Sequence, residues 1–419
     1  MLLLLLVLVA AVVWGKSLSG QGRSYCSLQL DGQVFCFGLN NFGQLGIDSK
    51  TDSPIPAQML GVDLAINISA GKSMSCIVEK AGIAKCTGRS LLGTGTRDSS
   101  TVLVPLPSLD QNVTQVYVSY YHACVLQGLT GSLSCWGTNA FGALGDGSTT
   151  TRDVPVFAHG FKSGGAKDVA MGIHHTCLLS VVGKIHCTGM NTQGQLGDGT
   201  VEHRRIMTPV AGLDSIATFS SVGCGAEHTC AVSMGGRVFC WGSNRMGQLG
   251  QPSTLTQATT GQFLAASGAE YAHSVTCGAY SNYLILRANS TVVVFGTNPN
   301  NGFGGNNNFT AFAPIRFGND QTQGVKEVQG GYTSTCVTYI TNPHTECVGI
   351  DTYGQLGNGK SLGSSRELDS VADLPILSTK SPVVTESLVP TVSPSASAHP
   401  GIPACSIIAM CLCFFVTTI

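Results

Sequence analysis

Residues 230–250 read Cys-Ala-Val-Ser-Met-Gly-Gly-Arg-Val-Phe-Cys-Trp-Gly-Ser-Asn-Arg-Met-Gly-Gln-Leu-Gly, and the chain of 419 residues contains seven variants of this stretch. The first cysteine position in successive copies is separated by 50, 48, 53, 53, 53 and 53 residues. A fixed period of this length indicates a solenoid, an array or a propeller. The seven positions are Cys26, Cys76, Cys124, Cys177, Cys230, Tyr283 and Cys336.

Each copy has the pattern of a β-hairpin. Apolar side chains alternate on both sides of a glycine turn, and this period of two residues predicts strands rather than helices. Folding at the turn places two cysteines, 10 or 11 residues apart, opposite each other within disulfide range. Reduced core cysteines are the alternative, and they would require a reducing compartment. The predicted pairs are Cys26 with Cys36, Cys76 with Cys86, Cys124 with Cys135, Cys177 with Cys187, Cys230 with Cys240 and Cys336 with Cys347.

Most copies end in Gly-Gln-Leu-Gly or Gly-Ala-Leu-Gly. These glycines are expected at positive φ or in close contact, where a β-carbon would clash. The glutamines are expected to satisfy backbone groups inside the turn, and a binding role on one rim is the alternative. The motifs occupy residues 43–46, 142–145, 194–197, 247–250 and 354–357.

The pattern His-Thr-Cys-Ala, glycine turn, Val-Phe-Cys-Trp-Gly-Ser-Asn, Gly-Gln-Leu-Gly resembles the regulator of chromosome condensation repeat, in the cysteine-bearing form common among secreted members. The resemblance covers about residues 19–377 and implies an all-β fold, a seven-bladed β-propeller built from seven repeats of about 50 residues. Copy two departs by a shortened loop after Cys86, and copy six lacks both cysteines. These departures affect the expected loop shapes and leave the expected fold unchanged.

The two ends of the chain differ in composition from the repeats. Residues 1–15 form an apolar run with the length of a signal-peptide core, although an uncleaved anchor is the alternative. Residues 16–377 then form the propeller, and residues 378–403 are a stalk rich in serine, threonine and proline. Residues 404–419 end in a short apolar tail, which together with small residues upstream predicts a glycosylphosphatidylinositol (GPI) anchor attached at Ser395.

Composition excludes one broad class of partner. The net charge is −1 and charged residues make up 11% of the chain, so no basic field attracts phosphates and no nucleic acid is expected as a partner. The chain also holds four asparagine-linked glycosylation motifs, which predict a glycoprotein if the chain is secreted. Their asparagines are Asn67, Asn112, Asn289 and Asn308.

Two remaining patterns concern histidine and cysteine. His122, His175 and His228 occupy the same position in three copies, but equivalent positions are spread around a propeller, so a structural role is expected rather than a metal site. Cys224 and Cys277, left over from the hairpin pairs, are predicted to bridge neighbouring copies, with two free buried thiols as the alternative. We predict no catalytic residue, no metal and no cofactor, and therefore no enzyme.

These features together predict a cell-surface, lipid-anchored propeller that binds an extracellular protein or glycan through loops at one end of its blades. The expected location is the extracellular face of the plasma membrane, with secretion as the alternative. A regulator resembling a guanine-nucleotide exchange factor is one alternative function, and it would require that the signal-peptide prediction is wrong. A secreted enzyme or enzyme inhibitor is another. The binding residues and the identity of the ligand do not follow from the sequence.

Overall fold

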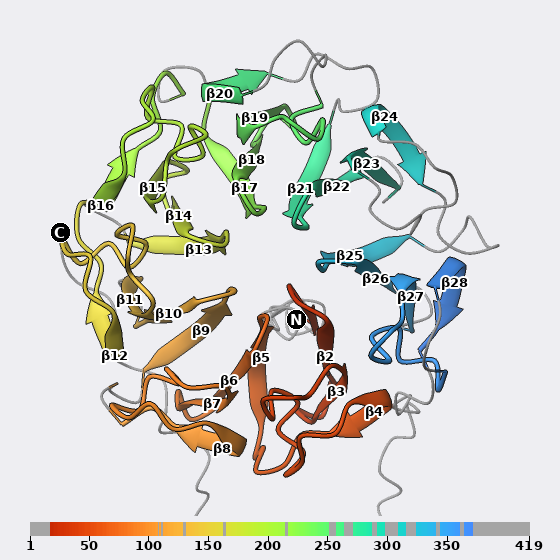
Figure 1. The fold of residues 1–419 in the computed structure, drawn as a ribbon. Helices are drawn as coiled ribbons and strands as arrows, with labels where there is room; N and C mark the ends of the chain where they lie inside the picture. The colour runs from red at the N-terminus through yellow and green to blue at the C-terminus, as the bar shows by residue number, and fades with distance from the viewer. Residues whose placement is uncertain are drawn as a thin grey trace, which may run out of the picture. The chain divides into compact units, whose positions relative to one another are not determined.

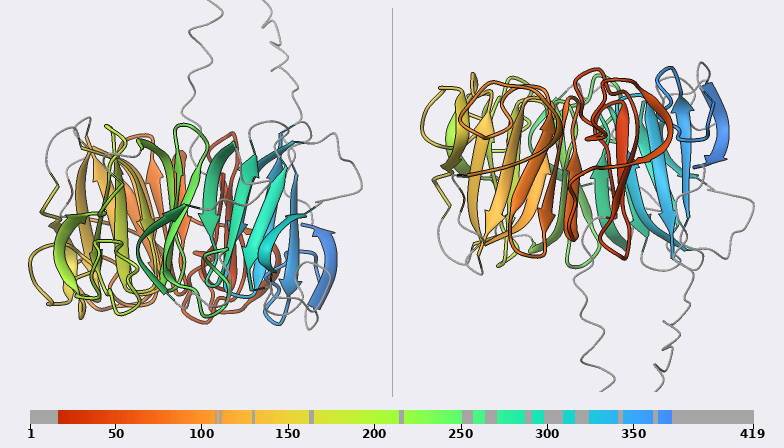
Figure 2. Two further views of the ribbon diagram at one scale, coloured as in Figure 1. Left: turned by 90° about the horizontal axis from the view of Figure 1, so that it is seen from above. Right: turned by 90° about the horizontal axis from the view of Figure 1, so that it is seen from below.

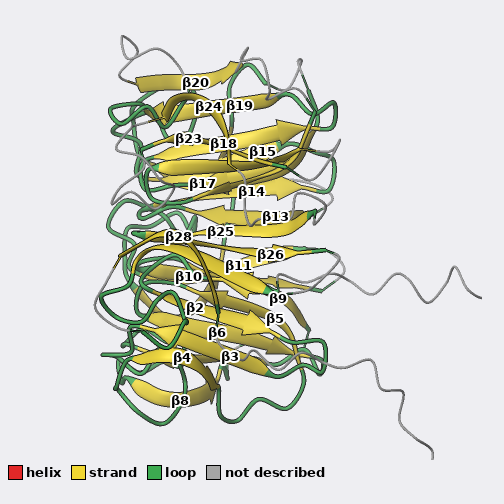
Figure 3. Cartoon of the chain, turned by 90° about the vertical axis from the view of Figure 1, so that its right-hand side faces the viewer, coloured by secondary structure: helices red, strands yellow, loops and turns green. Residues whose placement is uncertain are grey.

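The computed structural model describes residues 17–371, except for segments 108, 110–111, 129–130, 162–164, 214–216, 251–256, 264–270, 287–290, 298–308, 316–323, 341–343 and 361–363. All regular secondary structure in the described residues is β-strand (Figure 3). The described residues contain no helix that is long and apolar enough to cross a bilayer. The predicted signal peptide, stalk and anchor segment lie outside the described residues.

The strands form seven four-stranded antiparallel sheets, which are the blades of a propeller (Figure 1). Each blade uses four consecutive strands, so the predicted seven-bladed fold is confirmed. The first strand of a blade lines the centre of the ring and the fourth lies at the rim, while Figure 2 shows the strands running between the two faces.

The first four blades comprise β1 (Leu18–Ser19), β2 (Ser24–Leu28), β3 (Val34–Gly38), β4 (Ser53–Gln58), β5 (Ala65–Ala70), β6 (Met74–Glu79), β7 (Ala84–Gly88), β8 (Ser100–Pro105), β9 (Val113–Val118), β10 (His122–Gln127), β11 (Ser132–Gly137), β12 (Arg152–Phe157), β13 (Ala166–Met171), β14 (His175–Ser180), β15 (Ile185–Gly189) and β16 (Arg204–Pro209). The last three comprise β17 (Phe219–Cys224), β18 (His228–Ser233), β19 (Val238–Ser243), β20 (Gln257–Phe263), β21 (Ala272–Cys277), β22 (Ser281–Leu286), β23 (Val292–Gly296), β24 (Phe309–Ile315), β25 (Val325–Gly330), β26 (Ser334–Tyr339), β27 (Thr345–Ile350) and β28 (Ser364–Ser370).

The six predicted hairpin disulfides are all present, each joining the second and third strands of its blade. The paired cysteines are direct cross-strand partners, with Cα atoms 4.0 to 4.1 Å apart. Blade six places Tyr283 opposite Val294 instead. The Tyr283 hydroxyl hydrogen-bonds to Thr335 Oγ1 of blade seven at 2.7 Å. This tyrosine therefore links blades six and seven, whereas the disulfide at the same position in the other blades joins two strands of one blade.

Neighbouring blades also bond to each other near the central channel. Side-chain oxygens of Ser69 and Ser221 accept hydrogen bonds from the backbone N–H of Val118 and Val275 in the following blade. These bonds use inner-strand donors that the blade's own ladder leaves free, because the first strand is the inner edge of its sheet. The ring is therefore joined by backbone-directed bonds as well as by apolar packing.

The ring closes between blades seven and one without a shared strand. Each of these blades is complete in itself, and Tyr25 of blade one donates a hydrogen bond to Ser334 O of blade seven at 2.7 Å. Tyr25 and Phe37 pack with the Cys336–Cys347 disulfide in one buried cluster, against which Val371 rests. Among the described residues, the C-terminal part of the repeat region supports closure through the packing of Val371 against this cluster.

The predicted bridge between Cys224 and Cys277 is wrong, because both thiols are free and buried. Cys224 and Cys277 occupy equivalent positions, at the ends of the first strands of blades five and six. The rotation that relates one blade to the next therefore points both side chains in the same direction around the ring. The Cys224 thiol is directed at the backbone of Cys177 in the preceding blade. The Cys277 thiol is likewise directed at blade five, where a β-carbon on Gly223 would lie 2.9 Å from its sulfur. Each sulfur therefore faces the backbone of the preceding blade, and the two sulfurs are not bonded to each other.

Candidate functional site

The loops between the third and fourth strands are held by their own side chains. In blade four, Gln195 Oε1 accepts a hydrogen bond from the N–H of Gln193, and Asn191 Oδ1 accepts one from the N–H of Leu196, both at 2.9 Å. Gly194 and Gly197 have φ values of 76° and 69°. The expected roles of the glycines and glutamines are thus confirmed here, while the asparagine was missed by the sequence reasoning.

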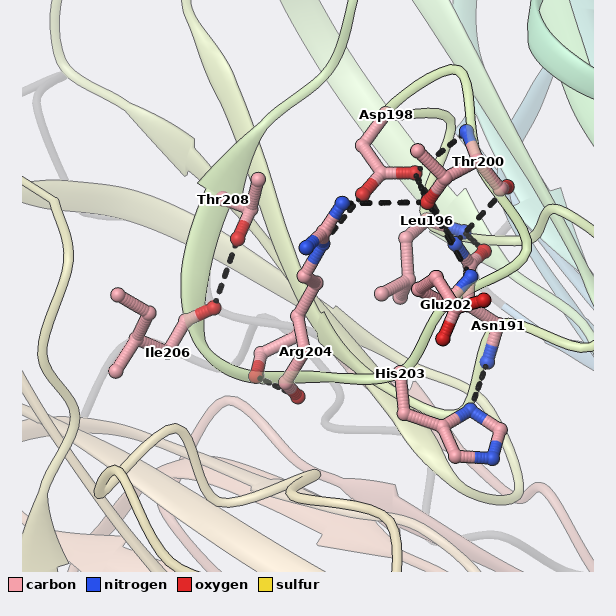
Figure 4. Close-up of polar contacts among 10 residues, drawn as sticks. Asn191, Leu196, Asp198, Thr200, Glu202, His203, Arg204, Ile206 and Thr208 are labelled. Carbon is pink, nitrogen blue, oxygen red and sulfur yellow. Dashed lines mark hydrogen bonds and ion pairs between the residues drawn. The ribbon is translucent and has the colours of Figure 1, made fainter.

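An ion pair stiffens the same loop in blade four (Figure 4). Arg204 Nε lies 2.6 Å from Asp198 Oδ2, and Thr200 Oγ1 donates to Asp198 Oδ1 at 2.7 Å. Burial alone would raise the pKa of Asp198, but the hydrogen bonds from Thr200 and Arg204 outweigh burial and lower it. Asp146 and Arg152 repeat the arrangement in blade three, so these loops form a rigid rim.

The three repeated histidines act as connections between blades. Each is buried and uses Nε2 to reach a polar side chain at the equivalent strand of the next blade, at 2.8 to 3.1 Å. That side chain in turn donates to a backbone carbonyl of the preceding blade's loop, as Thr229 Oγ1 does to Gln195 O at 2.9 Å. The pairs are His122 with Thr176, His175 with Thr229 and His228 with Asn282.

This geometry determines the protonation state of the rings. Asn282 Oδ1 can only accept, so His228 Nε2 must carry the hydrogen. Each threonine hydroxyl donates its single hydrogen to a backbone carbonyl, so it can only accept a hydrogen bond from the histidine Nε2. Burial lowers the pKa of His122 and His175 to about 3 and that of His228 to about 4. All three are therefore neutral, structural side chains at neutral pH.

Two groups of histidine and cysteine nonetheless bring possible metal ligands within 4.8 Å of one another. Cys177 and Cys230 are already in disulfides, and a metal needs the thiolate form. Each group therefore offers one imidazole and one thiol, fewer than the three or four protein ligands of a zinc site. The groups are His175, Cys177 and Cys224, and His228, Cys230 and Cys277.

Aromatic and basic side chains gather where the first and second strands of the blades join. We call these connections the mouth turns, because they surround one end of the central channel. Tyrosines from three blades approach one another there: the rings of Tyr120 and Tyr280 each lie 6.3 Å from that of Tyr332. The mouth turns are residues 20–23, 71–73, 119–121, 172–174, 225–227, 278–280 and 331–333.

Arg23 and Lys72 make cation–π contacts with tyrosine rings at the mouth. Lys72 Nζ lies 5.6 Å from the ring centre of Tyr120 and 5.7 Å from that of Tyr121. The guanidinium of Arg23 lies 5.1 Å from the Tyr353 ring and donates to its hydroxyl. Among the described residues, neither cation forms an ion pair with a carboxylate. Their charges are therefore available to a ligand.

A cavity of about 400 Å³ opens beside these turns, between blades two and three. Tyr121 stacks on His174 along it, with ring centres 5.1 Å apart and planes 7° from parallel. Burial lowers the pKa of His174, which favours the neutral imidazole in this wall. The lining residues are Ser73, Met74, Arg89, Ser90, Leu91, Ser119, Tyr120, Tyr121, His122, Thr138 and His174.

The sequence reasoning left the binding residues unknown, so this cavity was missed. A signal for it exists within the repeats themselves. The positions three and four residues before the first cysteine of each copy vary from copy to copy, while the position five before is mostly glycine and the position two before is mostly histidine or serine. Positions that vary within an otherwise regular repeat are those that packing does not constrain, and in blades one, three, four, five and six the residues three before are Arg23, Tyr121, His174, Glu227 and Tyr280.

The predicted glycosylation sites have different surroundings. Asn67 is only 7% exposed, and its Oδ1 accepts a hydrogen bond from the Val116 N–H of the next blade, so the folded blade has no room for a glycan. This prediction is corrected. Asn112 is exposed just before β9. Asn289, Asn308 and the predicted lipid attachment residue Ser395 lie outside the described residues.

Comparison with known proteins supports the repeat assignment. The sequence profile of the regulator of chromosome condensation (RCC1) repeat matches residues 31–78, 130–179, 182–232 and 235–285, and a second profile of this repeat matches residues 219–248. The ultraviolet-B receptor UVR8 of Arabidopsis thaliana is 27% identical over 353 residues, which cover 81% of this chain and 78% of the receptor. The human E3 ubiquitin-protein ligase HERC2 is 29% identical over 269 residues, which cover 61% of this chain but 6% of the ligase.

Solved structures share the fold. Human WBSCR16 superposes with a TM-score of 0.73 at 20% identity, and the match covers 81% of this chain and 94% of that chain. A chain of the complex of Kap60 with yeast RCC1 (Prp20) gives a TM-score of 0.71 at 16% identity, with 83% and 85% covered. At these identities the likeness concerns the fold alone.

Proposed function

Because the chain belongs to the regulator of chromosome condensation repeat family, we propose that its propeller is a binding module, held at the cell surface by a lipid anchor. It binds an extracellular protein or glycan at the channel mouth. The observation that carries this proposal is the cavity of about 400 Å³ whose walls combine aromatic rings with the cation Arg89, which forms no ion pair with any carboxylate of the described residues. Ligand sites typically have this size and this mixture of flat apolar walls and few polar groups.

The cysteine chemistry supports an extracellular location. Six cross-strand disulfides form and persist in oxidising compartments and are rare in the cytosol. The apolar run at residues 1–15 and the apolar tail at residues 404–419 agree with entry into the secretory pathway and with replacement of the tail by a lipid.

The rigid rim supports a binding role for the mouth. Loops held by buried hydrogen bonds and ion pairs keep their shape without a ligand, which lowers the entropy lost on binding. A yeast propeller of the same fold, Prp20p, is described as having binding properties toward Gsp1p and histones, so a protein partner is compatible with this architecture.

The binding test compares two faces of the ring on intact cells that display the full chain. Tyr121 is 41% exposed beside the cavity, and Leu30, 85% exposed, lies in a hairpin turn at the opposite end of its blade. Tyr121→Ala should weaken capture of the natural cell-surface partner by at least about tenfold, as loss of an aromatic hot-spot residue does. Leu30→Ala should leave capture unchanged. The reverse result would move the binding surface to the other face.

The anchor is tested separately with phosphatidylinositol-specific phospholipase. The enzyme should release the protein from intact cells into the medium, alongside a control protein with a cleavable lipid anchor. Deletion of residues 407–419 should cause secretion without the enzyme. Retention of the protein after the control has been released, with a C-terminal epitope still present, would rule out the lipid anchor.

A further inference from the structure

We propose that the cavity between blades two and three binds a sugar that carries a carboxylate, at the end of a glycan chain. This inference rests on the proposed binding function and names the chemistry of its ligand. It depends on three features of the cavity: its charge, its hydroxyl groups and its aromatic wall.

The charge of the cavity is positive. Arg89 lines it and is exposed, and its guanidinium lies 5.1 Å from the Phe42 ring. No described residue accepts a hydrogen bond from this guanidinium. Lys72 adds a second cation over the neighbouring rings of Tyr120 and Tyr121. No aspartate or glutamate lines the cavity, and the acidic mouth-turn residue Glu227 belongs to blade five. An anionic ligand is therefore favoured over a neutral or cationic one.

Polar groups without protein partners surround the same space. Among the described contacts, the hydroxyls of Ser73, Ser90 and Thr138, three residues that line the cavity, make no hydrogen bond. These hydroxyls are therefore free to donate to and accept from a ligand. Several free hydroxyls around one cation match a compact polyol that has a single acidic group.

The aromatic wall distinguishes a sugar from a simple anion. Tyr121 and His174 stack on each other and both line the cavity, so they give it a neutral, aromatic wall against which the C–H groups of a sugar ring can pack. A volume of about 400 Å³ is sufficient for one six-membered sugar ring and its substituents. An extended acidic peptide would instead need a groove with backbone partners along it. We therefore assign the cavity to the end of a glycan.

The first test measures binding of single sugars to the protein purified from cells, by saturation-transfer NMR. N-acetylneuraminic acid and glucuronic acid are the probes, and their neutral methyl esters are the matched controls. At least one acid should bind at least about tenfold more tightly than its ester, because a hydrogen bond to a charged group is lost in the ester. Equal binding of acid and ester, or no binding of either acid, would overturn the proposal.

Variants locate the site. Arg89→Gln should weaken acid binding at least about tenfold, whereas Arg245→Gln should have no effect, because Arg245 is an exposed arginine outside the cavity. Lys72→Gln is the second variant and should weaken binding less, which keeps the test decisive if Arg89→Gln fails to fold. Loss of binding only in the Arg245 variant would place the site elsewhere and refute the assignment.

Enzyme treatment of the partner cells tests this inference separately from the proposed function. Sialidase treatment of partner cells removes N-acetylneuraminic acid, and glycosaminoglycan lyases remove chains that contain uronic acids. Capture lost after one of these treatments supports the inference and identifies the source of the acid. Capture that survives both treatments, and survives Arg89→Gln, refutes the acidic-sugar inference while the binding function stands. If the protein binds no cell surface at all, the proposed function itself fails.

Discussion

Mild acid should destabilise this propeller through its three blade-connecting histidines. Burial holds the pKa of His122 and His175 at about 3 and that of His228 at about 4, against an ordinary value near 6.5. At a pH between the native and the ordinary pKa values, these histidines are protonated in the unfolded chain and neutral in the native ring. Stability is therefore fully present above about pH 6.5 and is lost as the pH falls toward 4.

The magnitude follows from the number of protons. Each histidine that protonates only on unfolding costs about 1.4 kcal/mol per pH unit, so three of them cost about 4 kcal/mol per unit in this window. Over the two units from pH 6.5 to 4.5 the loss approaches the whole stability of an ordinary domain, about 5 to 15 kcal/mol. The aspartates of the loops, whose pKa values are lowered, act with the same sign but below about pH 4, outside this window.

Urea unfolding at pH 6.5, 5.5 and 4.5 tests this, with the disulfides intact and the buried Trp136 and Trp241 as fluorescent reporters. His228→Gln keeps a donor for Asn282 Oδ1 but cannot titrate, so it should remove about one third of the pH slope. His159→Gln controls for the loss of a histidine at an exposed position. A free energy of unfolding that does not change between pH 6.5 and 4.5, or a full slope in His228→Gln, would refute the neutral-histidine argument.

Three further outcomes are expected. Replacing both Cys124 and Cys135 by serine should lower the free energy of unfolding by about 3 kcal/mol, the chain-entropy value for an 11-residue loop, and an unchanged urea midpoint would contradict this. Cys224 and Cys277 should resist alkylation until the protein unfolds, because burial raises the pKa of Cys224 to about 12 and that of Cys277 well above 9; labelling of the native protein at pH 8 would show that they are accessible. Asn112→Gln should lower the mass of the secreted protein by one N-linked glycan, and an unchanged mass would show that this exposed site is unused.

The features that the sequence determined are those made within a single repeat. A hairpin with cysteines 10 or 11 residues apart places them opposite each other in any antiparallel register that keeps the turn, so six disulfides could be predicted. The glycines and glutamines of Gly-Gln-Leu-Gly act within a few residues of their own position, as Gln195 does for the N–H of Gln193. The repeat period then implied the ring, because each repeat needs a neighbour to cover its apolar face.

The tertiary structure decided everything that depends on how one blade faces the next. Cys224 and Cys277 occupy equivalent positions in the repeats, but in the ring each thiol faces the preceding blade and both stay free. Asn67 has a glycosylation motif, yet its amide is buried against Val116 of the following blade. The cavity combines Arg89 of blade two with side chains of blades three and four. The contacts in all three cases join residues of different blades, and their geometry depends on the angle between blades, which no pattern inside one repeat specifies.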